Sequence, residues 1–263
     1  MTATDRRRRA SQWRRPLDQL ASPTRLLAQK LAAELVGTAF LLAAVVGSGI
    51  MAESLTDDVG LQLFQNAFAT AGVLVALILA LGPASGAHFN PAVTIADRLL
   101  GGIDTRTAAL YIVVQIVGGI LGVMAANIMF DLDMVEWSTK DRSATHLQFA
   151  EGVATLGLLL VIFGVVRSGR SSVAAFSVGG YIAGAYYFTS STSFANPAVT
   201  VARTFSDTFA GIAPRSAPAF IVAQLVATVL AVGLIRLIYP HPTDELPDTD
   251  DATDTAGPPE NRS

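Results

Sequence analysis

Six runs of apolar residues dominate this 263-residue chain and restrict it to folds that suit a membrane. The runs comprise residues 31–52, 63–81, 108–130, 149–166, 173–188 and 217–238. A bilayer core of roughly 30 Å requires about 20 apolar residues per helix, and the fourth and fifth runs are short for that length. Only 15% of the residues are charged and the mean hydropathy is +0.48, which is too apolar for an ordinary soluble domain. The runs therefore predict an all-α membrane protein with six transmembrane helices.

The placement of charge predicts the orientation of these helices. Basic residues gather before the first run, at Arg6, Arg7, Arg8, Arg9, Arg14, Arg15, Arg25 and Lys30. The positive-inside rule then places the N-terminus in the cytoplasm, and an even number of spans returns the C-terminus to the same side. We expect a multi-pass protein of a cell membrane, with a membrane domain at residues 28–240. Residues 1–27 are predicted to form a disordered basic tail, and residues 241–263 a disordered acidic tail.

The membrane domain contains an internal duplication. Ala33-Glu34 recurs as Ala150-Glu151, with the glutamates 117 positions apart. The triplet Asn-Pro-Ala begins at Asn90 and again at Asn196, 106 positions later, and Gln115 matches Gln224 at a separation of 109. The features recur in the same order, so we assign repeat one to about residues 28–130 and repeat two to about 144–240. Each repeat has three spans, an odd number, so the repeats are inverted in the membrane.

Each Asn-Pro-Ala triplet predicts the start of a half-helix. The triplets, Asn90-Pro91-Ala92 and Asn196-Pro197-Ala198, precede helix-compatible stretches at 92–100 and 198–205 that are too short to cross a bilayer. Asparagine favours the N-cap and proline the first helical position. Inversion brings the two helix N-termini together at the middle of the membrane, each with a partial charge of roughly +0.5. Such a site disfavours cations, whereas uncharged hydroxylated solutes can accept hydrogen bonds from the asparagine amides.

With these motifs the chain resembles the major intrinsic protein family, the aquaporins and aquaglyceroporins. The resemblance covers about residues 28–238 and rests on the two triplets, Ala33-Glu34, residues 85–94, Gln115, Glu151 and Gln224. It implies an aquaporin-like fold of six helices and two re-entrant half-helices, a homotetramer with one pore per subunit, and transport without energy coupling. The implied pore-lining residues are His88, Asn90, Pro91, Ala92, Asn196, Pro197 and Ala198.

The resemblance also implies a selectivity filter near the extracellular side. Water-selective members carry arginine directly after the second Asn-Pro-Ala, whereas this chain has Val199. Counting from the motifs without gaps gives Thr70, Gly184 and Ser193 for the other three filter positions. Such a filter is wide and uncharged, and the stretch Phe-Ala-Asn-Pro-Ala-Val-Thr resembles a bacterial subgroup associated with arsenic resistance. We expect passage of glycerol-like polyols, neutral arsenite or related metalloid hydroxides, and water.

Several other polar residues have a structural and a functional interpretation. Arg203 and Asp97 each follow an asparagine by seven positions, which places them in the two vestibules, ~10 Å from the centre. Each is a solvated or ion-paired helix-end charge, or a charge that attracts solute. His88 fixes its loop by hydrogen bonding or responds to pH. Glu34, Glu151, Gln115 and Gln224 are predicted to support the half-helical loops by hydrogen bonding.

Alternatives to the proposed channel remain open at this point. One is a water or glycerol facilitator with no role for arsenic, and another is a proton-coupled transporter that uses Glu34 or Glu151. A third is a structural or adhesive protein with a closed pore. No nucleophile, base and acid set suggests an enzyme, and the absence of cysteine argues against a metal site. We predict no cofactor and no nucleic-acid partner; the expected partners are small neutral solutes, lipid and further copies of the chain.

Overall fold

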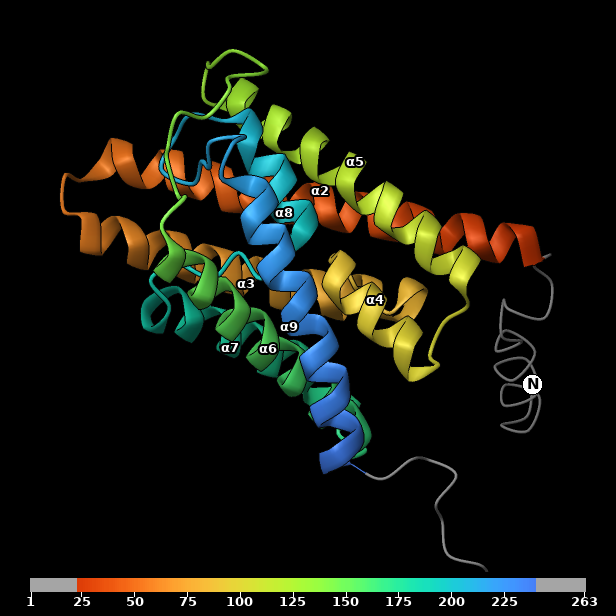
Figure 1. The fold of residues 1–263 in the computed structure, drawn as a ribbon. Coiled ribbons are helices and arrows are strands. Elements are labelled where there is room, and N and C mark those ends of the chain that lie inside the picture. Colours follow the sequence, from red (N-terminus) through yellow and green to blue (C-terminus); the bar gives the residue numbers. More distant parts are fainter. Residues whose placement is uncertain (1–22, 240–263) are drawn as a thin grey trace, which may run out of the picture.

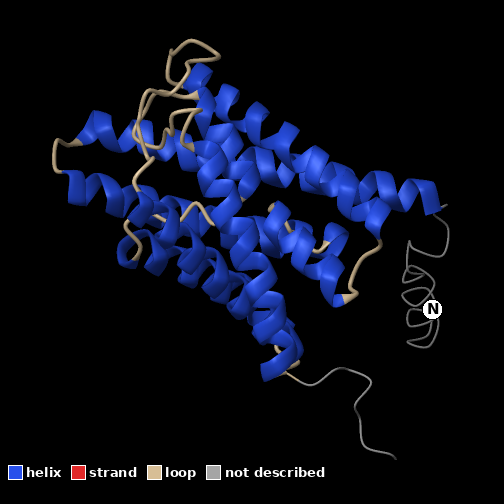
Figure 2. Cartoon of the chain, in the orientation of Figure 1, coloured by secondary structure: helices blue, strands red, loops and turns tan. Residues whose placement is uncertain are grey.

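The computed structural model describes residues 23–239, and this part of the chain is a bundle of helices without strands (Figures 1 and 2). The α-helices are α2 Pro23–Leu55, α3 Val59–Ser85, α4 Pro91–Leu100, α5 Thr105–Met129, α6 Thr145–Arg167, α7 Ala174–Phe188, α8 Pro197–Ala202 and α9 Ala217–Ile238. Two 3₁₀ turns, η2 Ser171–Val173 and η3 Arg203–Phe205, precede α7 and follow α8. The order of elements is that predicted: three long helices, with a short one before the third, occur twice.

Five of the described helices, α2, α3, α5, α6 and α9, are long and apolar enough to cross a membrane. The remaining long helix, α7, has 15 residues, which corresponds to about 22 Å. It covers the fifth run, one of the two predicted to be short, and η2 extends the same stretch toward α6. The fourth run lies in α6, which has 23 residues because the helix extends beyond the run at both ends. Because α7 packs against both α3 and α6, it completes the predicted six-helix bundle.

The first helix begins earlier than predicted. Residues 23–27 were assigned to the basic tail, but α2 starts at Pro23. Proline suits the first helical position, and the leucines that follow it favour helix, which explains the earlier start. The rest of the predicted basic tail and the whole of the acidic tail lie outside the described residues.

The two repeats pair their helices in the same way. In the first repeat α2 packs against α3 and α5, and in the second α6 packs against α7 and α9. The halves join through α3 and α7, which contact each other. Each short helix packs against both halves: α4 contacts α9 and α5, and α8 contacts mainly α5 and also α9. Figure 1 shows α8 between α5 and α9, and α4 beside α9.

Helices α2 and α5 make the most extensive contact among the described elements, and two glycines permit their approach. A Cβ atom at Gly118 would lie 2.3 Å from the carbonyl oxygen of Leu35, and one at Gly122 would lie 2.1 Å from that of Ala39. Real Cβ atoms do not come so close to backbone, so only glycine fits at these two positions. Small residues at such crossings are how membrane helices gain packing energy.

The loop between α5 and α6 holds the chain that follows η3. The backbone N–H of Glu136 donates to Phe205, and that of Ser138 donates to Thr204, at 3.2 and 3.0 Å. Farther along, the N–H of Ala213 donates to the carbonyl of Lys140 at 2.8 Å. These bonds fix residues 203–213 against the end of the bundle where α8 and η3 finish.

The close approach of α2 and α5 generates a stability prediction. Substitution Gly122→Ala forces these helices apart, and we expect a loss of about 1–3 kcal/mol because overpacked cores cost that much. The measurement is thermal unfolding of the purified protein in detergent. Gly233→Ala in α9 is the matched control, since a Cβ there meets no atom within 4 Å. Equal melting temperatures for the two variants would contradict the packing argument.

Candidate functional site

The two asparagines of the triplets cap the two short helices. Asn90 accepts a hydrogen bond at Oδ1 from the backbone N–H of Ala92, at 2.8 Å. Asn196 accepts two, from Ala198 at 2.9 Å and Val199 at 3.2 Å. Both asparagines have extended backbone, and proline follows each as the first helical residue. The local sequence therefore starts each helix at the asparagine, as predicted from N-cap and proline preferences.

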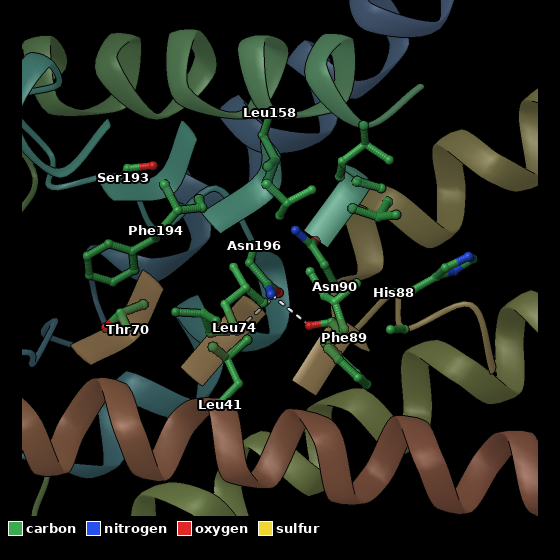
Figure 3. A pocket seen from close by; sticks show the side chains of 18 of the residues that line it. Leu41, Thr70, Leu74, His88, Phe89, Asn90, Leu158, Ser193, Phe194 and Asn196 are labelled. Carbon is green, nitrogen blue, oxygen red and sulfur yellow. Dashed lines mark hydrogen bonds between the residues drawn. The ribbon is translucent and has the colours of Figure 1, made fainter. Parts of the chain in front are cut away.

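The same asparagines join the two half-helices at their N-termini. The Nδ2 of Asn90 donates to the carbonyl of Ala195 at 2.8 Å. The Nδ2 of Asn196 donates to the carbonyl of Phe89, also at 2.8 Å (Figure 3). Each carbonyl belongs to the residue directly before the opposite asparagine. An amide NH₂ group has two hydrogens, so each asparagine retains one N–H beyond this bond.

The loops that lead into the two asparagines have unusual backbone. Ala87 and Phe89 have φ of +50° and +49°, and their counterparts Ser193 and Ala195 have +50° and +48°. For residues other than glycine this left-handed region costs roughly 1–2 kcal/mol each. The matched values in two distant segments indicate one loop conformation used twice, which needs compensating contacts.

Two buried glutamates supply those contacts. Glu34 accepts the backbone N–H groups of His88 at 2.9 Å and Phe89 at 2.7 Å. Glu151 accepts those of Phe194 and Ala195, both at 2.8 Å. The left-handed turns point consecutive N–H groups at one carboxylate, and hydrogen bonds to a charged acceptor are strong.

In each repeat, one glutamine connects the carboxylate to the half-helix. Gln115 donates from Nε2 to Glu34 at 2.8 Å and to Thr94 Oγ1 at 3.0 Å. In the second repeat Gln224 donates to Glu151 at 2.7 Å and to the hydroxyl of Thr200 at 2.9 Å. The two glutamates and two glutamines are all 0% exposed. Their contacts are those of groups that hold the loops, behind the wall of the cavity described next.

One cavity of about 220 Å³ lies between the repeats and passes both asparagines (Figure 3). Its wall is mostly apolar, with polar groups concentrated toward two ends. One end, which we call the outer end, includes Thr70, Tyr186, Ser193, Val199 and Arg203, and the other, the inner end, includes His88 and Asp97. Eight of the residues predicted for the pathway line this cavity: Thr70, His88, Asn90, Asp97, Ser193, Asn196, Val199 and Arg203.

Four residues predicted to line the pore do not line this cavity. Pro91, Ala92, Pro197 and Ala198 are all buried, and the wall contains none of them. The first turn of each half-helix packs inside the protein, and a Cβ at Gly119 of α5 would lie 3.4 Å from the backbone carbonyl oxygen of Ala198. The asparagine caps, which precede the helical turn, are the parts of the triplets that face the cavity.

The filter prediction for α7 also needs correction. Its cavity-lining residues, Ala174, Val178, Ile182 and Tyr186, are spaced four apart and so share one face. Gly184 lies two residues from Ile182 and from Tyr186, about 200° around the helix, and is exposed. A count from the motifs without gaps missed this shift, and α7 is apolar on every face, so its sequence pattern does not indicate which face lines the cavity.

Tyr186 is the polar residue that α7 contributes to the outer end. It is 3% exposed, and its hydroxyl donates to Thr70 Oγ1 at 3.2 Å. Beside it, Ser193 Oγ is buried and has no hydrogen-bond partner among residues 23–239. The outer end therefore contains three hydroxyl groups. The cavity is narrower there than it would be with glycine at the α7 position.

At the inner end the two predicted polar residues contact each other. His88 Nε2 lies 3.6 Å from Asp97 Oδ2, and His88 Nδ1 lies 3.1 Å from the hydroxyl of Thr94. The ring also meets Tyr111 edge to face, with 5.4 Å between centroids. His88 is thus held by its backbone N–H and by both ring nitrogens. The same histidine, when protonated, places a positive charge next to Asp97.

Arg203 is buried rather than solvated. Its exposure is 3%, and its guanidinium carbon lies 3.4 Å from the centroid of the Phe194 ring. Side chains on helices lean toward the N-terminus, so this one reaches back over the turn that precedes it. The estimate from backbone rise ignored that reach and placed the charge too far out.

A second buried arginine, Arg142, was not predicted. In the first repeat Tyr111 donates its hydroxyl to the carbonyl of Ser85 at 2.9 Å. The second repeat has Phe220 at the matching position, with no hydroxyl, and Arg142 Nη1 donates to Ser191 instead, at 3.1 Å. Comparison of Tyr111 with Phe220 would have indicated the missing donor, but nothing in the loop sequence pointed to Arg142.

Comparison with known proteins assigns the family. Residues 21–191 match the family model described as Major intrinsic protein. The chain is 47% identical over 210 residues to "Aquaglyceroporin AqpS" of Rhizobium meliloti (strain 1021), covering 80% of this chain and 90% of that protein. It is 33% identical over 163 residues to "Aquaporin NIP1-2" of Arabidopsis thaliana, covering 59% of this chain and 55% of that one.

A solved structure has the same fold. The X-ray structure of the aquaglyceroporin from Plasmodium falciparum superposes with a TM-score of 0.64 at 21% identity, over 80% of this chain and 99% of that one. The repeated half-helices, the matched carboxylate clusters and the family match agree. The chain therefore belongs to the major intrinsic protein family, and it is a membrane channel of the aquaporin and aquaglyceroporin type rather than an enzyme.

Proposed function

We propose that this channel passes small uncharged hydroxylated solutes, namely glycerol-like polyols and neutral arsenite, together with water. The observation that carries the proposal is the outer end of the cavity. It combines the hydroxyls of Thr70, Tyr186 and Ser193 with the apolar side chain of Val199. A solute with three hydroxyls on a compact body finds hydrogen-bond partners on one side and apolar contact on the other.

Arsenite in its neutral form, As(OH)₃, is similar in size to glycerol and also carries three hydroxyls. The unpartnered Ser193 Oγ is a group of the right chemistry to bond such a solute. A water and glycerol facilitator with no role for arsenic would have the same outer end. The comparison of glycerol and arsenite flux decides between them.

The burial and hydrogen bonding of the two glutamates favour downhill solute flux over proton-coupled transport. Glu34 and Glu151 are fully buried, and both are occupied by hydrogen bonds from the loops and from Gln115 and Gln224. Neither lines the cavity. A coupling carboxylate must exchange protons with the pathway, and these two are separated from it by the loops that they hold.

The proposal places the channel in a bacterial cell membrane as a homotetramer with one pathway per subunit. The apolar outer surface supports the membrane location, since large side chains such as Phe68, Phe149 and Leu237 are more than 70% exposed there. The family resemblance supports the tetramer.

Substitution of Val199 by arginine tests the filter assignment. In proteoliposomes followed by stopped-flow light scattering, we expect Val199→Arg to lower glycerol and arsenite flux on the order of tenfold, equivalent to ~1.4 kcal/mol of barrier. Water flux should fall less, because water is smaller. Val199→Met separates added length from added charge. Unchanged glycerol and arsenite flux in Val199→Arg would show that residue 199 is not in the constriction.

The corrected position on α7 makes a paired prediction. Tyr186→Ala widens the outer end, and we expect faster flux of polyols larger than glycerol, by roughly tenfold. Gly184→Ala should behave like the unsubstituted channel, because Gly184 is exposed and a Cβ there meets no atom within 4 Å. The measurement is the same light-scattering assay with a series of polyols of increasing length. The opposite pattern would restore Gly184 to the filter.

The role of Glu151 predicts a stability effect without a coupling effect. Glu151→Gln places an NH₂ group against backbone N–H donors, and we expect a loss of about 1–3 kcal/mol from unsatisfied buried groups. Thermal unfolding in detergent measures it. With an imposed proton gradient, the glycerol concentration inside the vesicles should reach that outside and not exceed it, for both proteins. Uphill accumulation that disappears in Glu151→Gln would establish a coupled transporter instead.

A further inference from the structure

Arg203 lies at the outer end of the cavity although it follows Asn196 by seven residues. Its guanidinium group stacks on the ring of Phe194, which precedes Asn196 by only two residues. The side chain of Arg203 contributes to the same wall as Ser193 and Val199. The length of arginine and its lean toward the helix N-terminus thus bring the charge back to the level of the second loop.

Arg203 uses only some of its side-chain N–H groups in hydrogen bonds to residues 23–239. Nε donates to the carbonyl of Ala210, and the N–H of Ile212 donates to the Arg203 carbonyl at 3.3 Å. These bonds hold the residue in the segment fixed by the loop between α5 and α6. The two Nη groups make no hydrogen bond to any of residues 23–239, so their N–H donors remain available.

The charge of Arg203 has no carboxylate partner within ion-pair distance among residues 23–239. The acidic group buried on this side, Glu151, already accepts bonds from Phe194, Ala195 and Gln224. The phenol of Tyr186, the remaining ionisable group that faces it from α7, donates to Thr70.

The charges next to this site have both signs. Arg142 lies 5.0 Å from the centroid of the Phe194 ring. In the adjoining loop, burial together with the charges of Arg142 and Arg203 lowers the pKa of Lys140 to about 8, while Glu53 and Asp207 act in the opposite direction. The two acidic groups lie by Lys140 and not on the cavity wall, so Arg203 is the charge that solvent screens least at this end of the cavity.

We propose that Arg203 supplies the fixed positive charge of the outer constriction, in place of an arginine directly after the second Asn-Pro-Ala. The inference rests on the proposed function, since it concerns which solutes the same pathway admits. It adds a second barrier to cations, beside the one expected from the two half-helix N-termini. Arg203 repels cations that enter from the outer end, and its free N–H groups donate to the oxygens of neutral solutes. Val199 leaves room for larger solutes, while the charge stays at the edge of the pathway.

The test compares sodium flux and glycerol flux in proteoliposomes containing the full-length channel. A sodium-sensitive dye inside the vesicles reports cation entry, and light scattering reports glycerol. We expect Arg203→Gln to raise sodium flux at least tenfold while glycerol flux remains well above that of empty vesicles. Arg215→Gln is the control, because Arg215 has a 70% exposed side chain outside the cavity and should match the unsubstituted protein in both assays.

A charge-conserving variant separates electrostatics from structure. Arg203→Lys keeps the positive charge near neutral pH, and a lysine in this cationic environment loses its proton more easily than arginine does. Sodium flux in Arg203→Lys should be low at pH 7 and rise toward pH 9, with no such rise in the unsubstituted channel. This readout also decides the question if Arg203→Gln does not fold.

The outcomes separate the two proposals. A folded Arg203→Gln channel that conducts glycerol and still excludes sodium, or a flat pH profile in Arg203→Lys, overturns the role of Arg203 and leaves the channel function intact. Absence of glycerol flux in the unsubstituted protein overturns the proposed function itself, whatever the variants do.

Discussion

The interaction on which the rest of this structure depends is the hydrogen bonding of two non-helical loops at membrane depth. A bilayer core offers no water to unpaired backbone groups, so each loop must be satisfied from within the protein. Glu34 and Glu151 do this by accepting consecutive N–H groups from the left-handed turns before Asn90 and Asn196. With the turns held, each asparagine caps its helix and bonds across to the other loop. The meeting of the two half-helices, and the cavity beside them, follow from these bonds.

The features that the sequence predicted correctly are those with a local physical cause. Asparagine favours the N-cap and proline the first helical position, and an odd number of spans in each repeat imposes inversion. The fold class, the two short helices and their approach at the N-termini could therefore be derived before any coordinates. Glu34 and Glu151 could be matched because they occupy the same place in two repeats, and their partners lie at the matched positions Gln115 and Gln224.

The features that the sequence predicted wrongly depend on side-chain direction and helix rotation. Gly184 was placed by counting residues, but a shift of two positions on a helix reverses the face, and Tyr186 faces the cavity instead. Arg203 was placed by backbone rise alone, whereas its long side chain turns back onto Phe194. Pro91 and Pro197 belong to the triplets but are buried and do not line the cavity. A one-dimensional pattern contains no direct information about such directions when the helix is apolar on every face.

The central claim is that solutes move past Asn90 and Asn196 through the cavity between the repeats. A high-resolution cryo-EM map of the channel in lipid with glycerol tests it most directly. The account predicts ordered density in the cavity within hydrogen-bond distance of the Nδ2 atoms of both asparagines, and further density beside Thr70 and Ser193. Ordered glycerol or water along a different route, with the space beside the two asparagines filled by side chains, would contradict it.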